Sequence, residues 1–303
     1  LQFVVNGKVE ADTSSRSMVL QRMMGHLPML FHPNARCVLN IGMGAGMTLG
    51  ALGCYPVSRL EVVEIEPMVR EAARIFGRKN GHVVERSDLV VTINDGRNLV
   101  FATARQYDVI TSDPFEPVAA GAANLYTVEH FEQVKGRLAP GGIAAQYVPL
   151  YEMSKEDYGT IVKTFVHVFP SSLLFYTGYD TILVGWKDEC KVDFASMARK
   201  FDIPSVRQSL AEVGFESTES IFNMLVGDMK NAVLPDYALL NTDRHPVIEF
   251  SAPKHTLQYM TDVNQRTLLA CFTEIPDRWL TGLTAEQRQS CERGHEAVRK
   301  TLS

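Results

Sequence analysis

Two acidic residues stand just after an apolar run near the middle of the 303-residue chain. Asp113 and Glu116 belong to the segment DPFEP, which follows the β-rich stretch YDVITS at 107–112. A carboxylate at the end of a strand can act as a general base that takes up a proton from a bound group. Asp and Pro also favour turns, so a turn without chemical function is the alternative interpretation. Acids at both positions favour a functional site, because a turn does not require both.

Three glycines, Gly42, Gly44 and Gly46, lie at or just after the end of a β-rich run at 37–42 and precede a helical pattern. Glycines let the backbone approach a ligand closely, and the N-terminus of the following helix favours electron-rich groups. Glu64 ends the next apolar run about twenty residues further on, where an acid commonly accepts hydrogen bonds from ribose hydroxyls. The pattern predicts a nucleotide- or nucleoside-binding loop, with a tight turn as the alternative.

A third strand-like run, at 88–94, leads into Asp95 and Gly96. A carboxylate at this place can accept a hydrogen bond from the exocyclic amine of adenine, and Gly96 would leave room for the ring. Asp95 as the N-cap of a helix beginning near Arg97 is the alternative, and the two roles are compatible. Ligand-facing groups at successive strand ends fit an open α/β sheet that binds an adenosyl group along its carboxyl edge.

The elements that must position these residues alternate along the chain. Residues 37–186 predict a doubly wound, Rossmann-like α/β sheet of the methyltransferase type with helices on both faces. Residues 1–36 predict a small β-hairpin with a turn at Asn6-Gly7 and then a helix, and residues 187–303 predict a mainly helical C-terminal extension. The expected strands of the central sheet lie at 37–42, 59–66, 88–94, 107–112 and 142–148, with a closing antiparallel pair at 173–177 and 181–186.

Composition limits the partners that the chain can have. It has 30 basic and 35 acidic residues, a net charge of −5 and no basic run interleaved with aromatics, so nucleic acid is not expected. The five scattered cysteines lack a Cys-x-x-Cys pair, and the histidines lack metal-ligand spacing, so we expect reduced thiols and no bound metal. No apolar stretch reaches the roughly 18 residues of a membrane helix.

Taken together, these motifs resemble the spermidine synthase (polyamine aminopropyltransferase) family over roughly residues 1–186. The resemblance is carried by VLNIGMGAG, VVEIEP, NDGR, YDVITSDPFEP and NLYTVEHFEQVKGRLAPGG. In that family the corresponding strand ends in an Asp-x-x-Asp-Pro motif. Asp113, Glu116 and Pro117 match that motif with one conservative change.

The resemblance implies a reaction and a role for each residue. The substrate would be S-adenosylmethionine or its decarboxylated form, methylthioadenosine would be released, and no metal would be needed. Asp113 would be the catalytic base, and Glu116 would help to hold a small amine acceptor. The remaining roles would be ribose binding at Glu64, adenine binding at Asp95 and Gly96, and the glycine loop at Gly42, Gly44 and Gly46.

Two departures from the family pattern concern the substrates, the first at the aminopropyl or methionine end of the sulfonium and the second at the acceptor. Ala45 stands where the family's glycine loop carries an acid, and about Leu20-Gln21-Arg22 replaces a Tyr-His-Glu segment. Gln21 and Tyr126 are the candidate substrate contacts that we retain here. Core packing is the alternative role for the polar and aromatic residues near the expected cleft, namely Tyr126, Gln146, Tyr147 and Tyr151.

Three functions therefore stay open. The first is aminopropyl transfer to an amine. The second is another reaction of S-adenosylmethionine on the same scaffold, either methyl transfer or internal attack by the substrate's own carboxylate without an acceptor. The third is a non-catalytic domain that senses an adenosyl ligand. The nucleoside product distinguishes them: methylthioadenosine, S-adenosylhomocysteine or none.

The context of the chain is a further expectation. The segments VNGKVEADT, GHLPMLFHP and NTDRHPVIEFSAP resemble spermidine synthase-like domains that bacteria fuse to membrane-spanning segments. Together with the start at Leu1, they predict a longer native polypeptide with membrane helices ahead of this chain. The chain would then lie at the cytoplasmic face of the inner membrane, or in the cytoplasm if it is complete. We also expect a homo-oligomer, namely a dimer.

Overall fold

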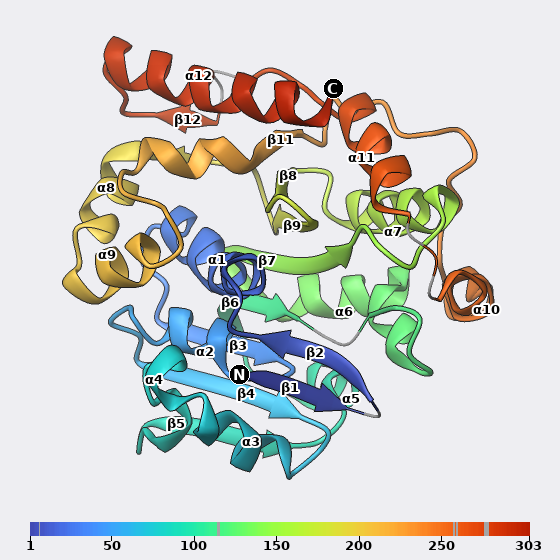
Figure 1. The fold of residues 1–303 in the computed structure, drawn as a ribbon. Coiled ribbons are helices and arrows are strands. Elements are labelled where there is room, and N and C mark those ends of the chain that lie inside the picture. Colours follow the sequence, from blue (N-terminus) through green and yellow to red (C-terminus); the bar gives the residue numbers. More distant parts are fainter. Residues whose placement is uncertain (6, 114–115, 257, 259, 276–278) are drawn as a thin grey trace.

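A mixed β-sheet runs through the middle of the molecule (Figure 1). The computed structural model describes residues 1–5, 7–113, 116–256, 258, 260–275 and 279–303. Within these residues the sheet has eight strands in the order β11-β8-β9-β7-β6-β3-β4-β5. The predicted α/β fold is confirmed. In chain order the strands are β3 (Cys37–Ile41), β4 (Arg59–Glu64), β5 (Leu89–Ile93), β6 (Tyr107–Ser112), β7 (Leu138–Pro149), β8 (Ser172–Tyr176), β9 (Asp180–Trp186) and β11 (Leu225–Asp228).

The strand order reverses in the middle of the sheet. β3 pairs in parallel with both β4 and β6, β4 continues to β5, and β6 continues to β7. β9 pairs antiparallel with β7 and β8, which confirms the predicted closing strand pair. The chain therefore moves outward from β3 to β5 and then returns to the other side of β3. In open α/β sheets, ligands bind at the carboxyl ends of the strands beside such a reversal.

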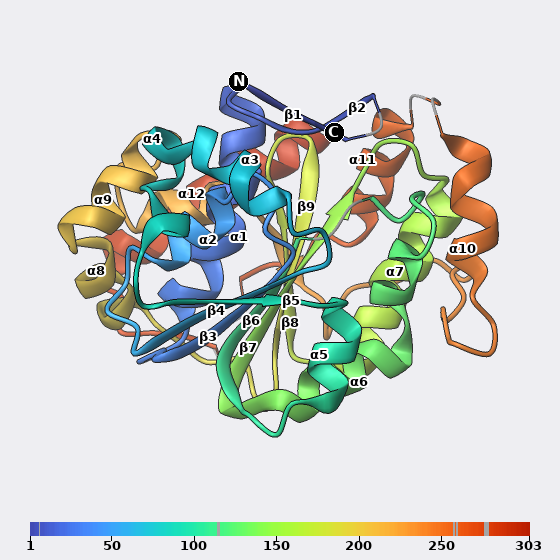
Figure 2. The same ribbon diagram turned by 90° about the horizontal axis from the view of Figure 1, so that it is seen from below.

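Helices cover both faces of the sheet, as Figure 2 shows. Side chains alternate between the faces along each strand. Val38 accordingly joins one apolar cluster, and its neighbour Leu39 joins the other. One layer holds α1 (Ser15–Phe31), α2 (Met47–Leu52), α3 (Val69–Ile75), α4 (Gly77–Asn80), α8 (Phe194–Phe201) and α9 (Pro204–Ala211). The other holds α5 (Gly96–Ala102), α6 (Val128–Arg137) and α7 (Lys155–Val168).

Side chains cap the N-termini of two helices on this face of the sheet. The Thr127 side chain accepts a hydrogen bond from the backbone N–H of His130 at the start of α6. The Ser154 side chain accepts from the backbone N–H of Asp157 at the start of α7. These contacts satisfy N–H groups that have no partner inside the helix, which is why Thr and Ser are favoured at this position.

The N-terminal hairpin consists of β1 (Gln2–Val5) and β2 (Lys8–Asp12), which pair antiparallel. Its predicted turn at Asn6-Gly7 includes Asn6, which lies outside the described residues. Phe3 and Ala11 are buried against the body of the molecule. In Figure 2 the hairpin lies over the end of the sheet toward which β7 runs. The hairpin therefore forms a wall above the carboxyl edge of the sheet.

The residues after Trp186 take part in the main sheet as well as forming helices. They contain α10 (Val247–Ser251), α11 (Thr261–Ala270), α12 (Ala285–Leu302) and a short parallel pair of β10 (Val192–Asp193) with β12 (Leu280–Thr281). β11 pairs antiparallel with β8 and so extends the sheet. The division of the chain at residues 36 and 186 stays a prediction. In the described part of the chain, no helix combines the length and apolar character needed to cross a lipid bilayer.

Gly25 in α1 lies where that helix packs against α2. A Cβ atom at this position would lie 2.7 Å from the Ala51 Cβ atom and 2.8 Å from the Thr48 carbonyl oxygen. Both distances are too short, so one helix would have to move. We therefore expect Gly25→Ala to lower the free energy of unfolding by about 1–3 kcal/mol, the usual cost of overpacking. Urea denaturation followed by circular dichroism measures this change.

Gly136 in α6 provides the matched control, because a Cβ atom there would meet no described atom within 4 Å. Gly136→Ala should raise the free energy of unfolding by up to about 1 kcal/mol, since alanine favours the helix. Equal changes in both variants would contradict the tight contact at Gly25.

Candidate active site

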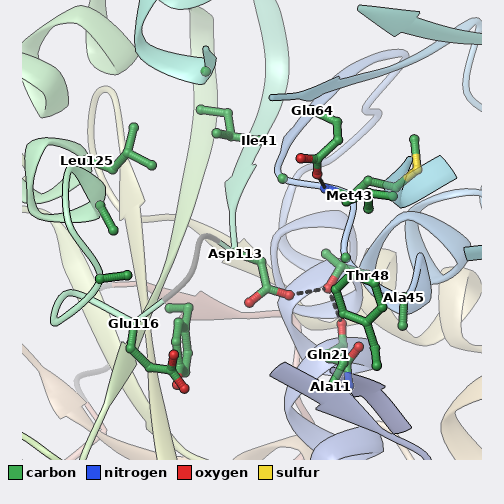
Figure 3. A pocket seen from close by; sticks show the side chains of 18 of the residues that line it. Ala11, Gln21, Ile41, Met43, Ala45, Thr48, Glu64, Asp113, Glu116 and Leu125 are labelled. Carbon is green, nitrogen blue, oxygen red and sulfur yellow. Dashed lines mark hydrogen bonds between the residues drawn. The ribbon is translucent and has the colours of Figure 1, made fainter. Parts of the chain in front are cut away.

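A cleft of about 920 Å³ opens at the carboxyl edge of the sheet, beside the reversal of strand order. Its walls come from the β1–β2 hairpin, the start of α1, the segments that follow β3, β4, β5 and β6, and residues near the end of β7 and the start of β9. Figure 3 looks into this cleft. The cleft brings together most of the site residues that the sequence predicts, namely Gln21, Gly42, Gly44, Glu64, Asp95, Gly96, Asp113 and Glu116.

The glycine loop between β3 and α2 forms one wall of the cleft. Gly42, Gly44 and Gly46 have φ angles of 85°, 49° and 78°, in the left-handed region that favours glycine. A Cβ atom at Gly44 would meet no described atom within 4 Å, so the backbone there faces open space. A Cβ atom at Gly46 would lie 2.9 Å from the Asn80 side-chain nitrogen. Gly44 can therefore approach a ligand, whereas Gly46 is buried and serves the packing of α2 against α4.

Glu64, the last residue of β4, holds the glycine loop in place. One of its carboxylate oxygens accepts a hydrogen bond from the Met43 backbone N–H at 2.8 Å, and the other accepts from the Glu66 N–H at 2.9 Å. The residue is buried, with 6% of its surface exposed, yet it lines the cleft. Each carboxylate oxygen has a second lone pair, so Glu64 can also accept hydrogen bonds from a ligand.

Asp95 and Gly96 lie at the start of α5. The Asp95 carboxylate accepts from the Asn98 backbone N–H at 2.9 Å, so the N-cap role is confirmed, and this residue also lines the cleft. A Cβ atom at Gly96 would lie 2.5 Å from the Cγ2 atom of Ile41. The close neighbour of Gly96 is thus a side chain of β3. Packing against that strand is one reason for the glycine, and Gly96 also lines the cleft, so the expected room for a ring stays a prediction.

Asp113 directly follows β6 and lies in the middle of the cleft. Its Oδ2 atom accepts a hydrogen bond from the Thr48 hydroxyl at 2.9 Å, as Figure 3 shows. Burial raises the pKa of Asp113 to about 6, the nearby Glu116 adds to the increase, and the Thr48 hydrogen bond opposes it. Pro114 and Phe115, between the two acids in the sequence, lie outside the described residues.

The Thr48 hydroxyl suits both protonation states of Asp113. Its oxygen also lies 2.9 Å from the Gln21 carbonyl oxygen. A threonine has one hydroxyl proton, so it donates to Asp113 when that carboxylate is ionised. When Asp113 is protonated, it can donate to the Thr48 oxygen while Thr48 donates to the Gln21 carbonyl. A carboxyl group that has a hydrogen-bond partner in both protonation states, and whose pKa is about 6, is suited to proton transfer.

Two further carboxylates lie in the same cleft. Glu116, 6% exposed, accepts a hydrogen bond from the Tyr151 hydroxyl at 2.7 Å. Asp180, also 6% exposed, is the first residue of β9. Burial raises the pKa of Asp180 to about 7, the charges of Glu116 and Asp113 add to the increase, and Arg16 opposes it.

Sequence reasoning missed Asp180 as a site residue, since it lies between the two expected strands of the closing pair. The available signal was its position next to the apolar run TILVGW, because an acid that opens a buried strand has to be accommodated.

The candidate substrate contacts occupy different places. Gln21 lines the cleft, and its side-chain nitrogen donates to the Ser17 hydroxyl at 2.8 Å. Tyr126 is completely buried behind the wall of the cleft, which favours its packing alternative. Tyr147 and Tyr151 line the cleft, with hydroxyl oxygens 3.0 Å apart. The assignment of all these residues to substrate binding or catalysis stays a prediction.

An exposed apolar side chain completes the wall next to Glu64. Ile65 follows Glu64 directly, lines the cleft and has 63% of its surface exposed. A flat aromatic ring bound in the cleft could cover it, which would remove apolar surface from water. Sequence reasoning did not single out this residue. Across the described residues, no group of three His, Cys, Asp or Glu side chains is arranged to hold a metal ion.

The chain is similar to known proteins. A family model described as the spermine/spermidine synthase domain matches residues 17–188. Polyamine aminopropyltransferase 2 of Hyperthermus butylicus is 32% identical over 169 residues, 55% of each chain. The polyamine aminopropyltransferase of Klebsiella pneumoniae is 33% identical over 137 residues, 45% of this chain and 48% of the other. The chain thus spans about half the length of these curated relatives.

The same fold occurs in a solved structure. The crystal structure of spermidine synthase from Thermotoga maritima matches with a TM-score of 0.58 and 21% sequence identity, over 77% of each chain. This likeness concerns the fold alone. It confirms that the order of strands and helices described above belongs to a known architecture.

The raised pKa of Asp113 links the stability of the fold to pH. The ordinary value is 3.8, and the folded protein holds the proton up to about pH 6. The resulting stabilisation is complete below about pH 4 and is lost as the pH rises through 6. Asp113→Asn has no such proton to lose. Between about pH 4 and pH 7.5 it should therefore gain stability relative to the parent protein, by about 1–3 kcal/mol. Urea denaturation at each pH tests this, and a pH-independent difference would contradict it.

Proposed function

Since the chain belongs to the spermine/spermidine synthase domain family, we propose that it transfers an aminopropyl group from decarboxylated S-adenosylmethionine to an amine and releases methylthioadenosine. The observation that carries this proposal is the position of Asp113. Its carboxylate, with a pKa near neutrality, lies in the same cleft as Glu64 and Asp95. A proton acceptor beside a site suited to a nucleoside fits a reaction between an amine and an adenosyl sulfonium.

The nucleoside end of the substrate would bind along the ends of β3, β4 and β5. Glu64 would accept hydrogen bonds from the ribose hydroxyls, because the carboxylate is fixed by two backbone N–H groups. Asp95 would accept from the adenine amine with the lone pairs that remain after it caps α5. Gly44 leaves space for the ligand, and Ile65 offers an apolar surface to the adenine ring.

The reaction itself needs a base and correct positioning. The amine nitrogen attacks the carbon next to the sulfonium, the carbon–sulfur bond breaks, and its electron pair stays on sulfur as a neutral thioether. An amine with a pKa near 10 must lose a proton for this attack. Asp113 would take up that proton. Glu116, held by Tyr151, would anchor the amine so that nitrogen, carbon and sulfur are in line, which supplies much of the acceleration.

One observation favours a second candidate function. Ala45 is buried in the wall of the cleft, at the place where the family's glycine loop carries an acid. The amine of an aminopropyl group would find no carboxylate at that place. Acceptor-free breakdown of S-adenosylmethionine by its own carboxylate would not need one, and it also releases methylthioadenosine.

A single experiment separates these reactions. The protein is incubated with S-adenosylmethionine or its decarboxylated form, with and without diamines, and the products are identified by mass spectrometry. Aminopropyl transfer requires the decarboxylated form and a diamine. Methylthioadenosine formed from S-adenosylmethionine without any amine indicates internal attack. S-adenosylhomocysteine indicates methyl transfer, and no nucleoside product at all leaves a ligand-sensing domain.

Two proposals on context rest on the resemblance to membrane-fused domains. We propose that the native protein carries membrane helices ahead of this chain and presents it at the cytoplasmic face of the inner membrane. We also propose that it forms a homodimer. The full reading frame tests the first proposal, and light scattering of the purified protein tests the second.

Glu64→Gln tests the nucleoside site. The amide replaces one carboxylate oxygen by a donor, so one of the two backbone N–H groups or the ribose loses its acceptor. We expect methylthioadenosine to bind more weakly by about 1–3 kcal/mol in isothermal titration calorimetry. Glu66→Gln is the matched control, because Glu66 is an exposed acid two residues further on. An unchanged affinity in Glu64→Gln would remove Glu64 from the site.

Asp113→Asn tests the base. Turnover should fall by about 10²–10⁴-fold, while methylthioadenosine binding stays nearly unchanged. Glu116→Gln should act mainly on the KM of the amine. In the parent protein, kcat/KM should fall as the pH drops below about 6, because a protonated Asp113 cannot accept the proton. Turnover by Asp113→Asn at the parent rate, when chemistry limits the rate, would show that Asp113 is a turn residue only.

A further inference from the structure

The turn that follows β7 contains a residue in an unfavourable backbone conformation next to the cleft. Glu152 has a φ angle of 52°, in the left-handed region that residues other than glycine rarely adopt. It directly follows Tyr151, which lines the cleft and donates its hydroxyl proton to Glu116 at 2.7 Å. Such a conformation costs free energy and persists only where the surrounding structure fixes it. The contacts of this turn therefore decide where the Tyr151 hydroxyl lies.

One side chain from the C-terminal region holds both ends of this turn. The side-chain nitrogen of Asn264, in α11, donates to the carbonyl oxygens of Leu150 and Met153, each at 2.9 Å. Asn264 is completely buried. An amide group has two N–H donors, so a single asparagine can serve both carbonyls. Tyr151 and Glu152 lie between these two carbonyls in the sequence, so opening the turn would break at least one of the bonds.

The helix that carries Asn264 is itself fixed to the body of the molecule. The side-chain nitrogen of Gln265, the next residue, donates to the Tyr176 hydroxyl of β8 at 2.7 Å. Leu268, one helical turn further on, is completely buried in the apolar cluster that also contains side chains of α7. Asn264 therefore projects from an anchored helix, and its amide gives the turn a fixed point.

Buried asparagines serve the same purpose at another wall of the cleft. The Asn80 side-chain nitrogen donates to the carbonyl oxygen of Ala45 in the glycine loop at 3.0 Å and to that of Ala73 at 2.8 Å. The Asn40 side-chain nitrogen donates to the Gly42 carbonyl oxygen at 2.5 Å. Both asparagines are buried, so their amides hold backbone segments in place. A side-chain amide that fixes the backbone is thus a recurrent feature of this site.

We propose that Asn264 is a positioning residue for the acceptor end of the site: by holding the turn at 150–153, it places the Tyr151 hydroxyl where it donates to Glu116. The proposed function assigns the amine to Glu116. Burial holds the pKa of Tyr151 well above its usual value, so this hydroxyl keeps the proton that it donates. Without that hydrogen bond, the Glu116 carboxylate is free to turn away from the amine.

The inference gives the C-terminal region a part in the reaction. Asn264 lies beyond residues 17–188, which the family model matches. A residue outside the matched domain would therefore set the geometry of a residue inside it. The effect on the amine rests on the proposed function, whereas the position of Tyr151 can be measured without any reaction.

The first test observes Tyr151 in the protein alone. 3-Fluorotyrosine is introduced at position 151 only, and its fluorine NMR resonance is recorded. Asn264→Leu keeps a side chain of similar size but removes both donors, so the resonance should move or broaden. An unchanged resonance would overturn the inference. If circular dichroism shows that this variant does not fold, Asn264→Ser takes its place, because serine has one donor and can serve only one of the two carbonyls.

Gln265→Leu is the matched control. It makes the same kind of change at the next position of the same helix, but it removes a contact with β8 and not with the turn. Both variants should lower the stability of the fold, and only the change at Asn264 should alter the resonance of residue 151. Equal changes in both variants would mean that α11 acts on the cleft only through general stability.

The second test measures the reaction. In Asn264→Leu, kcat/KM for the amine should fall at least about tenfold, the scale of one lost hydrogen bond to a charged group. The KM of decarboxylated S-adenosylmethionine should change less than about twofold, and Gln265→Leu should keep both parent values. Tyr151→Phe should cause a similar loss for the amine. Adding Asn264→Leu to Tyr151→Phe should then cost less than about a further twofold, because the hydroxyl is already absent. Additive losses would contradict action through Tyr151.

The outcomes separate this inference from the proposed function. If the parent protein forms no methylthioadenosine but the resonance of residue 151 depends on Asn264, the positioning of Tyr151 stands and the proposed reaction fails. If the parent protein transfers an aminopropyl group while Asn264→Leu leaves the resonance and the amine kinetics unchanged, the reaction stands and the inference fails. A resonance that moves while the amine kinetics stay unchanged would also overturn the inference.

Discussion

The Thr48 hydroxyl is the point at which the parts of the site meet. It lies within hydrogen-bond distance of the Asp113 carboxylate after β6 and of the Gln21 carbonyl in α1. Thr48 itself belongs to α2, which directly follows the glycine loop. The contact with Gln21 requires α1 and α2 to approach closely, and that approach depends on Gly25 having no side chain. The contact with Asp113 joins the acid of the cleft to the helix that follows the loop suited to a nucleoside.

Buried negative charge is the dominant electrostatic feature of the cleft. Asp113 and Asp180 both have raised pKa values because burial disfavours their charged forms, and each is further raised by neighbouring carboxylates. Such an arrangement costs stability, since burying like charges is unfavourable. It is suited to a cationic ligand, which would relieve the repulsion on binding. This electrostatic repulsion is located where, in the proposed reaction, an amine and a sulfonium would meet.

Residues far along the chain shape the wall of the cleft opposite the glycine loop. The buried side chain of Asn241 donates to the Tyr126 carbonyl oxygen at 3.0 Å and accepts from the Ile248 backbone N–H at 3.3 Å. The short helical segment at Ala122–Tyr126 is thereby held in place, and its residues Ala122 and Leu125 line the cleft. The segment NTDRHPVIEF thus acts on the site through the backbone that it supports.

The sequence by itself determined the alternation of strands and helices and the acids at the strand ends. Both are local properties, because side-chain periodicity and capping residues lie within a few positions of each other. Parallel strands end at one edge of a sheet, so the order of residues along the chain was enough to assign Glu64, Asp95 and Asp113 to one cleft.

Only the tertiary structure decided which other groups face those acids. Asp180 belongs to the closing strand pair, and the sequence does not indicate what lies next to it. The pairing of β9 with β7 brings Asp180 close to Tyr147. Tyr126 and Tyr147 could not be told apart as aromatic residues near the cleft, yet the first is enclosed and the second lines the cleft. Burial and the approach of distant carboxylates set the pKa values, and neither exists in the unfolded chain.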